Sequence, residues 1–166
     1  EPLAELPYPM RPDGMPLRLG AYGRYCRQKG FDRLISAMRS VPAEIATLKL
    51  RGFGDDEAAL KALAADLPNV DVGGPVDDLK AFLGSVDAIV MPSRWEAFGQ
   101  VALEARMAGR PVIACAVDGL TEQIEPHAGL QIPSDEPAEL ADAIRALAQV
   151  TDLSGMGQAA RDSAID

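Results

Sequence analysis

Short apolar runs alternate with amphipathic stretches from residue 17 to the end of this 166-residue chain. The apolar runs predict six β-strands, at residues 17–21, 47–51, 70–72, 88–91, 111–114 and 130–132. The amphipathic stretches predict helices at residues 31–39, 56–67, 76–83, 99–108, 120–124 and 137–149, and residues 153–166 either form one more helix or fray. The helical spacing is clearest near Leu140 and Ile144, where Pro137 suits the first turn and Ser134 or Asp135 can cap it.

This alternation with short connections predicts the α/β class. We expect a single domain built on a Rossmann-like, doubly wound parallel sheet of about six strands, with helices on both faces. Ligands of such folds bind beyond the carboxyl ends of the strands. The segments that follow each strand are therefore where functional residues are expected.

Residues 1–16 differ in composition from the rest of the chain. They hold five prolines, namely Pro2, Pro7, Pro9, Pro12 and Pro16. Such a run is unsuited to a helix or a central strand, so we interpret it as an extended, proline-rich interdomain linker with a turn at residues 12–14. Residues 17–166 then form the domain. The chain starts at Glu1 and not at Met, as a fragment of a longer protein would.

The net charge of the chain limits the classes of partner that are expected. A formal net charge of -9 and a pI near 4.6 make nucleic acid or an anionic membrane unlikely as general partners. The longest apolar runs, such as residues 111–117, are far too short to cross a bilayer, and the N-terminus has no secretory signal pattern. Cys26 and Cys115 form no CxxC pair, so we interpret both as reduced thiols in a cytoplasmic protein.

Basic residues cluster after the first predicted strand. Arg24, Arg27 and Lys29 lie in the segment from Gly20 to Gly30, at the expected ligand edge of an otherwise acidic chain. A basic loop that opens a helix can bind phosphate through charge and free backbone N–H groups. Taken alone, the segment fits an ordinary solvated loop somewhat better than a binding loop.

The glycines after the second predicted strand do not make a dinucleotide fingerprint. Gly52 and Gly54 lack the third glycine, whose place is held by Glu57, and they follow the second strand instead of the first. We expect Asp55, Asp56 and Glu57 to cap a helix and not to bind a metal ion.

Two glutamates flank the next helix start. Glu96 lies in the loop after the fourth predicted strand, and Glu104 lies within the following helix. A carboxylate at either place can accept hydrogen bonds from sugar or ribose hydroxyls, and Gly99 between them lets a ligand approach a helix N-terminus that favours phosphate. Glutamates eight residues apart also occur by chance, so the spacing alone is weak.

The ordered succession of motifs is far more specific. Residues 23–35, 52–54, 74–79, 86–93, 96–105, 109–114 and 129–141 together resemble the retaining glycosyltransferases of group 1, also called family 4, with Glu96 and Glu104 as their E-x7-E signature. The likeness is to the C-terminal, donor-binding domain of these two-domain GT-B enzymes, and it covers most of residues 17–150.

This resemblance implies a donor-binding site. Its members would be Gly23, Arg24, Lys29, Gly74, Val76, Glu96, Phe98, Gly99, Gln100, Val101 and Glu104. Arg24 and Lys29 would hold the donor diphosphate and, with Glu96 on the transferred sugar, act as the catalytic residues. Glu104 would bind the ribose hydroxyls, the backbone of residues 98–101 would meet sugar and phosphate, and the base would lie near residues 74–76.

Three neighbouring residues need separate interpretation. The family often has two glycines before the segment that corresponds to residues 120–122, whereas Asp118 replaces the first here and only Gly119 remains. Aspartate tolerates the left-handed backbone better than most residues, so the turn can survive. Trp95 is expected to be partly buried beside the site, or to stack on a ligand. His127 is expected to be structural or exposed.

The resemblance implies transfer of a sugar from a nucleoside diphosphate sugar to an acceptor with retention of configuration. It assigns no metal ion or cofactor, and the acceptor-binding N-terminal domain would be absent from this chain. The enzyme would be cytoplasmic, or peripheral at the inner face of the membrane with contact only through the absent domain. Two alternatives stay open: a GT-B nucleotide-sugar epimerase and a non-catalytic nucleotide-sugar-binding module. A second, N-terminal domain in the intact protein would favour an enzyme over the module.

Overall fold

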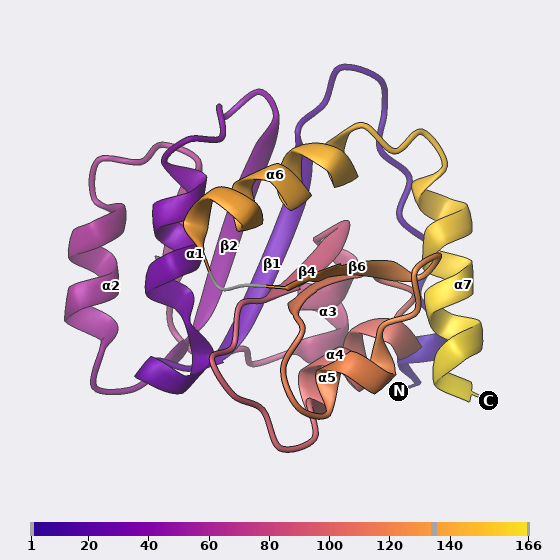
Figure 1. The fold of residues 1–166 in the computed structure, drawn as a ribbon. Coiled ribbons are helices and arrows are strands. Elements are labelled where there is room, and N and C mark those ends of the chain that lie inside the picture. Colours follow the sequence, from indigo (N-terminus) through magenta and orange to yellow (C-terminus); the bar gives the residue numbers. More distant parts are fainter. Residues whose placement is uncertain (1, 134–135, 166) are drawn as a thin grey trace.

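A computed structural model describes residues 2–133 and 136–165 of the chain. Its centre is a six-stranded, entirely parallel sheet with the strand order β3-β2-β1-β4-β5-β6 (Figure 1). The strands are β1 (Leu17–Arg24), β2 (Ala46–Phe53), β3 (Val70–Gly73), β4 (Ala88–Met91), β5 (Val112–Cys115) and β6 (Gly129–Ile132). The predicted class and the number of strands are confirmed.

Helices cover both faces of the sheet, as predicted (Figure 1). One face carries α1 (Phe31–Met38), α2 (Glu57–Ala64) and α6 (Pro137–Ala148), and the other carries α3 (Leu79–Gly84), α4 (Gln100–Met107) and α5 (Leu120–Gln123). The last helix, α7 (Leu153–Ile165), packs against α4. Of the two outcomes expected for the C-terminal segment, a helix or a frayed end, the helix is the one observed. Two apolar clusters, one on each face, form the core.

Several element boundaries differ from the prediction, by up to three residues. β1 continues to Arg24 because all eight of its residues pair in register with β2, from Leu17↔Ala46 to Arg24↔Phe53. Gly23 and Arg24 therefore end a strand, where a loop from Gly20 was expected.

The helix expected from residue 76 starts at Leu79. The Asp78 side chain caps it there by accepting the Ala81 N–H at 2.9 Å. Pro137 opens α6 as predicted, but the capping residues Ser134 and Asp135 lie outside the described residues. At α2 the N-cap is Asp56, and its side chain makes no capping hydrogen bond.

The proline-rich segment is packed onto the domain. It contains a short 3₁₀ helix, η1 (Leu3–Glu5), so the expectation of a wholly extended segment was wrong there. The predicted turn forms, with the Met15 N–H bonded to the Pro12 carbonyl at 3.2 Å. The guanidinium of Arg161 in α7 donates to the Leu6 carbonyl at 2.7 Å and stacks over the Tyr8 ring at 4.3 Å. Whether the segment links two domains stays a prediction.

Candidate functional site

The strand order reverses direction between β1 and β4. From β1 the chain moves outward through β2 and β3, and it then returns to β4 on the other side of β1 and continues to β5 and β6. At such a switch point the connections at the carboxyl ends of the two central strands diverge and leave a crevice that binds ligands. Lys29 follows β1 and Glu96 follows β4, so the topology brings the two predicted segments to this point.

Backbone and side-chain hydrogen bonds join these two segments directly. The Arg94 N–H donates to the Gln28 carbonyl at 2.8 Å, and the Gln28 side chain donates to the Trp95 carbonyl at 3.2 Å. Gly30 makes the approach possible: its φ is +69°, and a Cβ there would lie 2.0 Å from the Pro92 carbonyl oxygen. The close contact between the segments thus depends on a glycine at this position.

The predicted diphosphate and sugar residues form an ion pair with each other. Lys29 Nζ lies 3.0 Å from Glu96 Oε2, and the two side chains are only 20% and 10% exposed. The same oxygen accepts a hydrogen bond from Ser93 Oγ at 3.3 Å, within a loop that packs against the core. Because partial burial weakens screening by water, the attraction within this pair is stronger than between two fully exposed side chains.

Asp118 takes part in holding Glu96. Its φ is +41°, so it adopts the positive-φ backbone that the missing glycine would have allowed. Its carboxylate accepts the Glu96 backbone N–H at 3.2 Å. The turn survives as expected, and the aspartate charge lies beside the Glu96 loop.

Glu104 is held by two donors. On α4 it accepts a hydrogen bond from Tyr22 Oη at 2.6 Å and another from Gln100 Nε2 at 3.2 Å. Burial and then the bond to Glu104 raise the pKa of Tyr22 above its ordinary value. Gly99 precedes the helix with a φ of +78°, and a Cβ there would lie 2.5 Å from Leu120 Cδ2. A larger residue would be strained by this positive φ and would also have to displace the Leu120 side chain.

The start of α4 offers backbone donors to the same region. The first intrahelical bond at this end runs from the Ala102 N–H to the Gly99 carbonyl at 3.0 Å, so the N–H groups of Gln100 and Val101 precede the helical ladder. The Phe98 carbonyl is already engaged by the Gln123 side chain. Of the backbone groups predicted to meet the ligand, the two helix-terminal N–H groups are the best suited to an anion.

Two arginines line an open hollow of about 610 Å³ where β1 and β2 end. Its walls are Arg24, Tyr25, Cys26, Arg27, Phe53, Gly54, Asp55 and Asp56. Both arginine side chains are exposed. The Arg27 carbonyl accepts a hydrogen bond from Arg94, which also pairs with Asp32 at 2.8 Å and lowers the pKa of that carboxyl. Arg94 therefore anchors the basic segment to α1.

The remaining predicted residues also lie at this edge of the sheet. Gly74 and Val76 occupy the connection from β3 to α3, where the Gly74 carbonyl accepts the Gly52 N–H at 3.1 Å. Trp95 is half exposed, as expected of a residue partly buried at the rim. His127 is exposed, as expected, and its Nε2 lies 3.1 Å from Glu125 Oε2. Its partner is therefore neither Glu96 nor Glu104.

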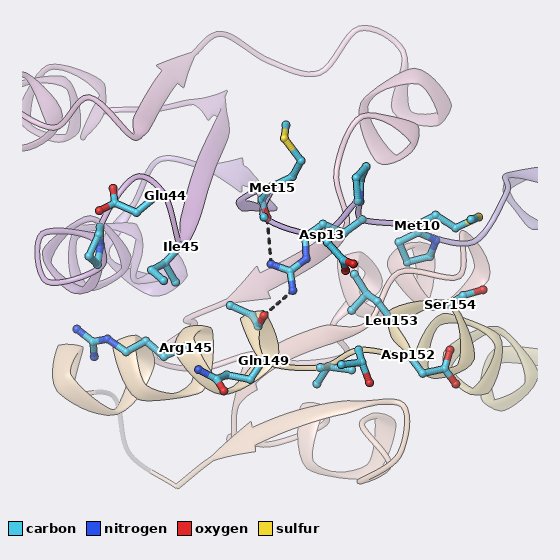
Figure 2. Close-up of a pocket in the computed structure, with 18 residues that line it drawn as sticks. Met10, Asp13, Met15, Glu44, Ile45, Arg145, Gln149, Asp152, Leu153 and Ser154 are labelled. Carbon is cyan, nitrogen blue, oxygen red and sulfur yellow. Dashed lines mark hydrogen bonds between the residues drawn. The ribbon is translucent and has the colours of Figure 1, made fainter.

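A larger hollow of about 760 Å³ lies at the opposite edge of the sheet (Figure 2). It is formed where the proline-rich segment passes the start of β2 and the connection from α6 to α7. Arg11 spans it with hydrogen bonds to the Met15 and Ala148 carbonyls. Because this is the amino end of the strands, it is not where a doubly wound sheet binds its ligand.

Some residues of this site escaped the sequence analysis. Tyr22, Ser93, Arg94 and Gln123 all bond to the predicted residues or to the loops that carry them. Tyr22 belongs to β1 through its pairing with β2, which the local sequence pattern does not show. For the other three no local signal exists, since their partners lie in other segments or depend on loop geometry.

Within residues 2–133 and 136–165, no group of three or more His, Cys, Asp or Glu side chains is placed to hold a metal ion. None of the helices in these ranges is both long and apolar enough to cross a membrane.

The sequence matches a known family and known proteins. A family model described as "Glycosyl transferases group 1" matches residues 16–149. The chain is 36% identical over 137 residues to D-inositol 3-phosphate glycosyltransferase from Pseudarthrobacter chlorophenolicus, covering 75% of this chain and 33% of that protein. It is 38% identical over 100 residues to lipopolysaccharide core biosynthesis glycosyltransferase LpsE from Rhizobium meliloti, covering 58% of this chain and 29% of that protein.

A solved structure agrees with these matches. The crystal structure of HepE from Anabaena in complex with UDP-glucose superposes with a TM-score of 0.81 at 26% identity, and covers 90% of this chain and 44% of that one. The chain spans about a third of the length of the two curated relatives and under half of HepE.

Proposed function

The chain belongs to the group 1 glycosyltransferases, and from that premise we propose that it is the donor-binding domain of a GT-B enzyme that transfers a sugar with retention of configuration. The donor is a nucleoside diphosphate sugar. HepE, whose fold this chain shares, was crystallised with UDP-glucose, which supports a ligand of this class.

The observation that carries this proposal is the Lys29–Glu96 ion pair at the switch point of the sheet. One cation and one hydrogen-bond-accepting anion follow the two central strands, at the sheet position where doubly wound folds bind nucleotides, which supports the proposal. A diphosphate sugar offers the complementary pair, an anionic diphosphate joined to a neutral ring of hydroxyls. Glu104, on the helix that follows the Glu96 loop, supplies the acceptor for ribose.

The same groups suit the chemistry of transfer. The bond between the anomeric carbon and the diphosphate oxygen breaks, the acceptor hydroxyl oxygen bonds to the same face of that carbon, and the hydroxyl proton passes to the leaving diphosphate. Negative charge grows on the leaving diphosphate. In our proposal Lys29, Arg24 and the N–H groups at the start of α4 stabilise that charge once the donor is bound. No metal ion or cofactor is assigned a role in this scheme.

Donor binding changes the ion pair. An ammonium has three N–H donors, and Glu96 accepts a hydrogen bond from one of those of Lys29. A diphosphate would compete for Lys29, and Glu96 would then turn its accepting capacity to the sugar hydroxyls. We propose that this exchange couples diphosphate binding to sugar binding.

The wider proposal includes an acceptor domain elsewhere in the full protein. We propose that this partner domain holds the acceptor and any membrane contact, and that the enzyme works in the cytoplasm. The epimerase and non-catalytic module remain as alternative functions, which activity of the complete protein with donor and acceptor would separate from transfer.

Donor binding gives the first prediction. Titration of the chain with UDP-, GDP- and ADP-sugars should show one nucleotide class that raises the melting temperature. At ten times the Kd, binding contributes about 1.4 kcal/mol, which is roughly 3–6 °C for a domain of this size. Thermal shift and calorimetry measure it. Absence of a shift and of binding heat with all three classes would contradict the proposed function.

Transfer gives the second prediction. We expect this chain to bind the donor without transferring its sugar to an added acceptor, because GT-B chemistry takes place between two domains and the acceptor groups lie on the other. Product analysis by mass spectrometry checks this, with the complete protein as the positive control. Robust transfer by the 166-residue chain alone would refute the division of labour, whereas slow donor hydrolysis would not.

A further inference from the structure

Tyr22 connects the sheet to Glu104 by a hydrogen bond, and the proposed function gives this tyrosine no role. The residue lies near the end of β1, and its hydroxyl donates to Glu104 Oε2 at 2.6 Å. Its ring meets Phe82 of α3 edge-on, with centroids 5.4 Å apart and planes at 77°. The ring is thus fixed by apolar packing, while the hydroxyl reaches the functional edge of the molecule.

Glu104 needs such a partner to have a defined orientation. A glutamate side chain on a helix has three rotatable bonds, and its other donor, Gln100, is an exposed residue one turn earlier on the same helix. Tyr22 belongs instead to the central strand, whose position is set by pairing with both β2 and β4. It is therefore the more rigid of the two contacts.

The contact leaves the carboxylate able to bind a ligand. Each carboxylate oxygen can accept about two hydrogen bonds, so the bonds from Tyr22 and Gln100 leave one accepting position on each oxygen. Two adjacent hydroxyl groups, such as those of a ribose, match two such positions. Hydrogen bonds to an ionised acceptor are also about twice as strong as neutral ones, so correct orientation has a measurable effect.

We infer that Tyr22 is a positioning residue for the nucleotide, whose hydroxyl orients Glu104 to accept the two ribose hydroxyls of a ribonucleoside diphosphate. This inference rests on the proposed function. Tyr22 makes no contact with the reacting atoms in this scheme and acts through Glu104. The raised pKa of Tyr22 is consistent with the role, because it keeps the hydroxyl protonated and therefore a donor.

The test compares Tyr22→Phe with Tyr8→Phe in the 166-residue chain. Tyr8→Phe removes the same atom far from the site, where the ring stacks under Arg161. The probes are UDP, GDP and ADP, and then the 2′,3′-dideoxy form of whichever binds wild type best. We expect Tyr22→Phe to weaken the ribonucleotide about 3- to 10-fold, as for loss of one hydrogen bond, and to leave the dideoxy form unchanged. Tyr8→Phe should alter neither.

Glu104→Ala provides a second, independent measurement. If Tyr22 acts through this carboxylate, Tyr22→Phe should cause no further loss of ribonucleotide affinity in the Glu104→Ala background. Additive losses would overturn the inference. So would an equal loss for the ribo and dideoxy ligands, or no loss with either, in a Tyr22→Phe protein that melts like Tyr8→Phe. Failure of wild type to bind any of the three diphosphates would overturn the proposed function itself, and this inference with it.

Discussion

Replacement of Lys29 by alanine is expected to weaken binding of the nucleoside diphosphate more than any other single change in this chain. A charge-assisted hydrogen bond contributes about 1.5–3 kcal/mol, which is roughly 10- to 150-fold in affinity. Lys29 should lie toward the upper end, because its side chain is only 20% exposed and weak screening strengthens its interaction with an anion. Isothermal calorimetry with the preferred nucleoside diphosphate measures the effect.

Arg24→Ala should produce a smaller loss within the same range. Arg24 ends β1 at the rim of the open hollow and is exposed, so water and salt screen its charge. Raising the salt concentration should therefore reduce the contribution of Arg24 more than that of Lys29. Titrations at two ionic strengths separate the two residues.

Arg27→Ala is the matched control for both changes. Its side chain is an exposed cation in the same segment, and its structural contact to Arg94 uses the backbone carbonyl, which alanine keeps. We expect it to cost much less affinity than either of the other substitutions. Equal losses for all three would indicate a diffuse basic patch in place of a defined diphosphate pocket.

Lys29→Ala has a second consequence that must be measured apart from binding. It leaves the Glu96 carboxylate, which is 10% exposed, without its cation. An uncompensated charge in a partly buried place destabilises a protein, so the melting temperature of the ligand-free variant should fall. Affinity is then compared well below that temperature. A loss of binding in a fully folded sample is the result that concerns the site.

The sequence predicted the architecture well because one periodic pattern carries it. Buried parallel strands are short apolar runs, and the helices between them show a different period, so their order is visible without knowledge of any contact. The end of β1 was harder to predict from the sequence. Tyr22, Gly23 and Arg24 are not an apolar run, and they belong to the strand only because β2 pairs with them. Pairing between strands is a tertiary property that the local pattern does not contain.

The residues of the site also fall into a predicted and an unpredicted group. Resemblance to a family placed Lys29, Glu96 and Glu104 in one site, and the switch point of the sheet explains why residues 67 positions apart can form an ion pair. The residues that hold those side chains were not predicted. Asp118 was noticed as a departure from the family pattern, but its bond to the Glu96 N–H depends on the path of two loops. The roles of Asp118 and Tyr22 became visible only with the fold.

Substitutions of the two glutamates should differ in which ligand they weaken. Glu104→Gln keeps the shape of the side chain and exchanges a charged acceptor for a neutral amide, and ribose is present in every donor. It should therefore weaken both the nucleoside diphosphate and the nucleotide sugar, by on the order of 1–2 kcal/mol. Glu96→Gln should weaken the nucleotide sugar alone, by a similar amount. Calorimetry of each variant against each ligand makes the comparison.

The ion pair with Lys29 makes the expected effect of Glu96→Gln on diphosphate binding more specific. Glu96→Gln removes the anion that competes with the diphosphate for Lys29, so affinity for the bare nucleoside diphosphate should stay the same or increase slightly. In the complete enzyme the same variant should lower turnover, because contacts to the sugar strengthen as positive charge develops on its ring. If Glu96→Gln instead weakens the bare diphosphate as much as the nucleotide sugar, the donor does not lie along this loop as proposed. If both variants bind both ligands like wild type, the carboxylates only hold the loop and α4 in place, and the functional interpretation of the E-x7-E motif in this chain is wrong.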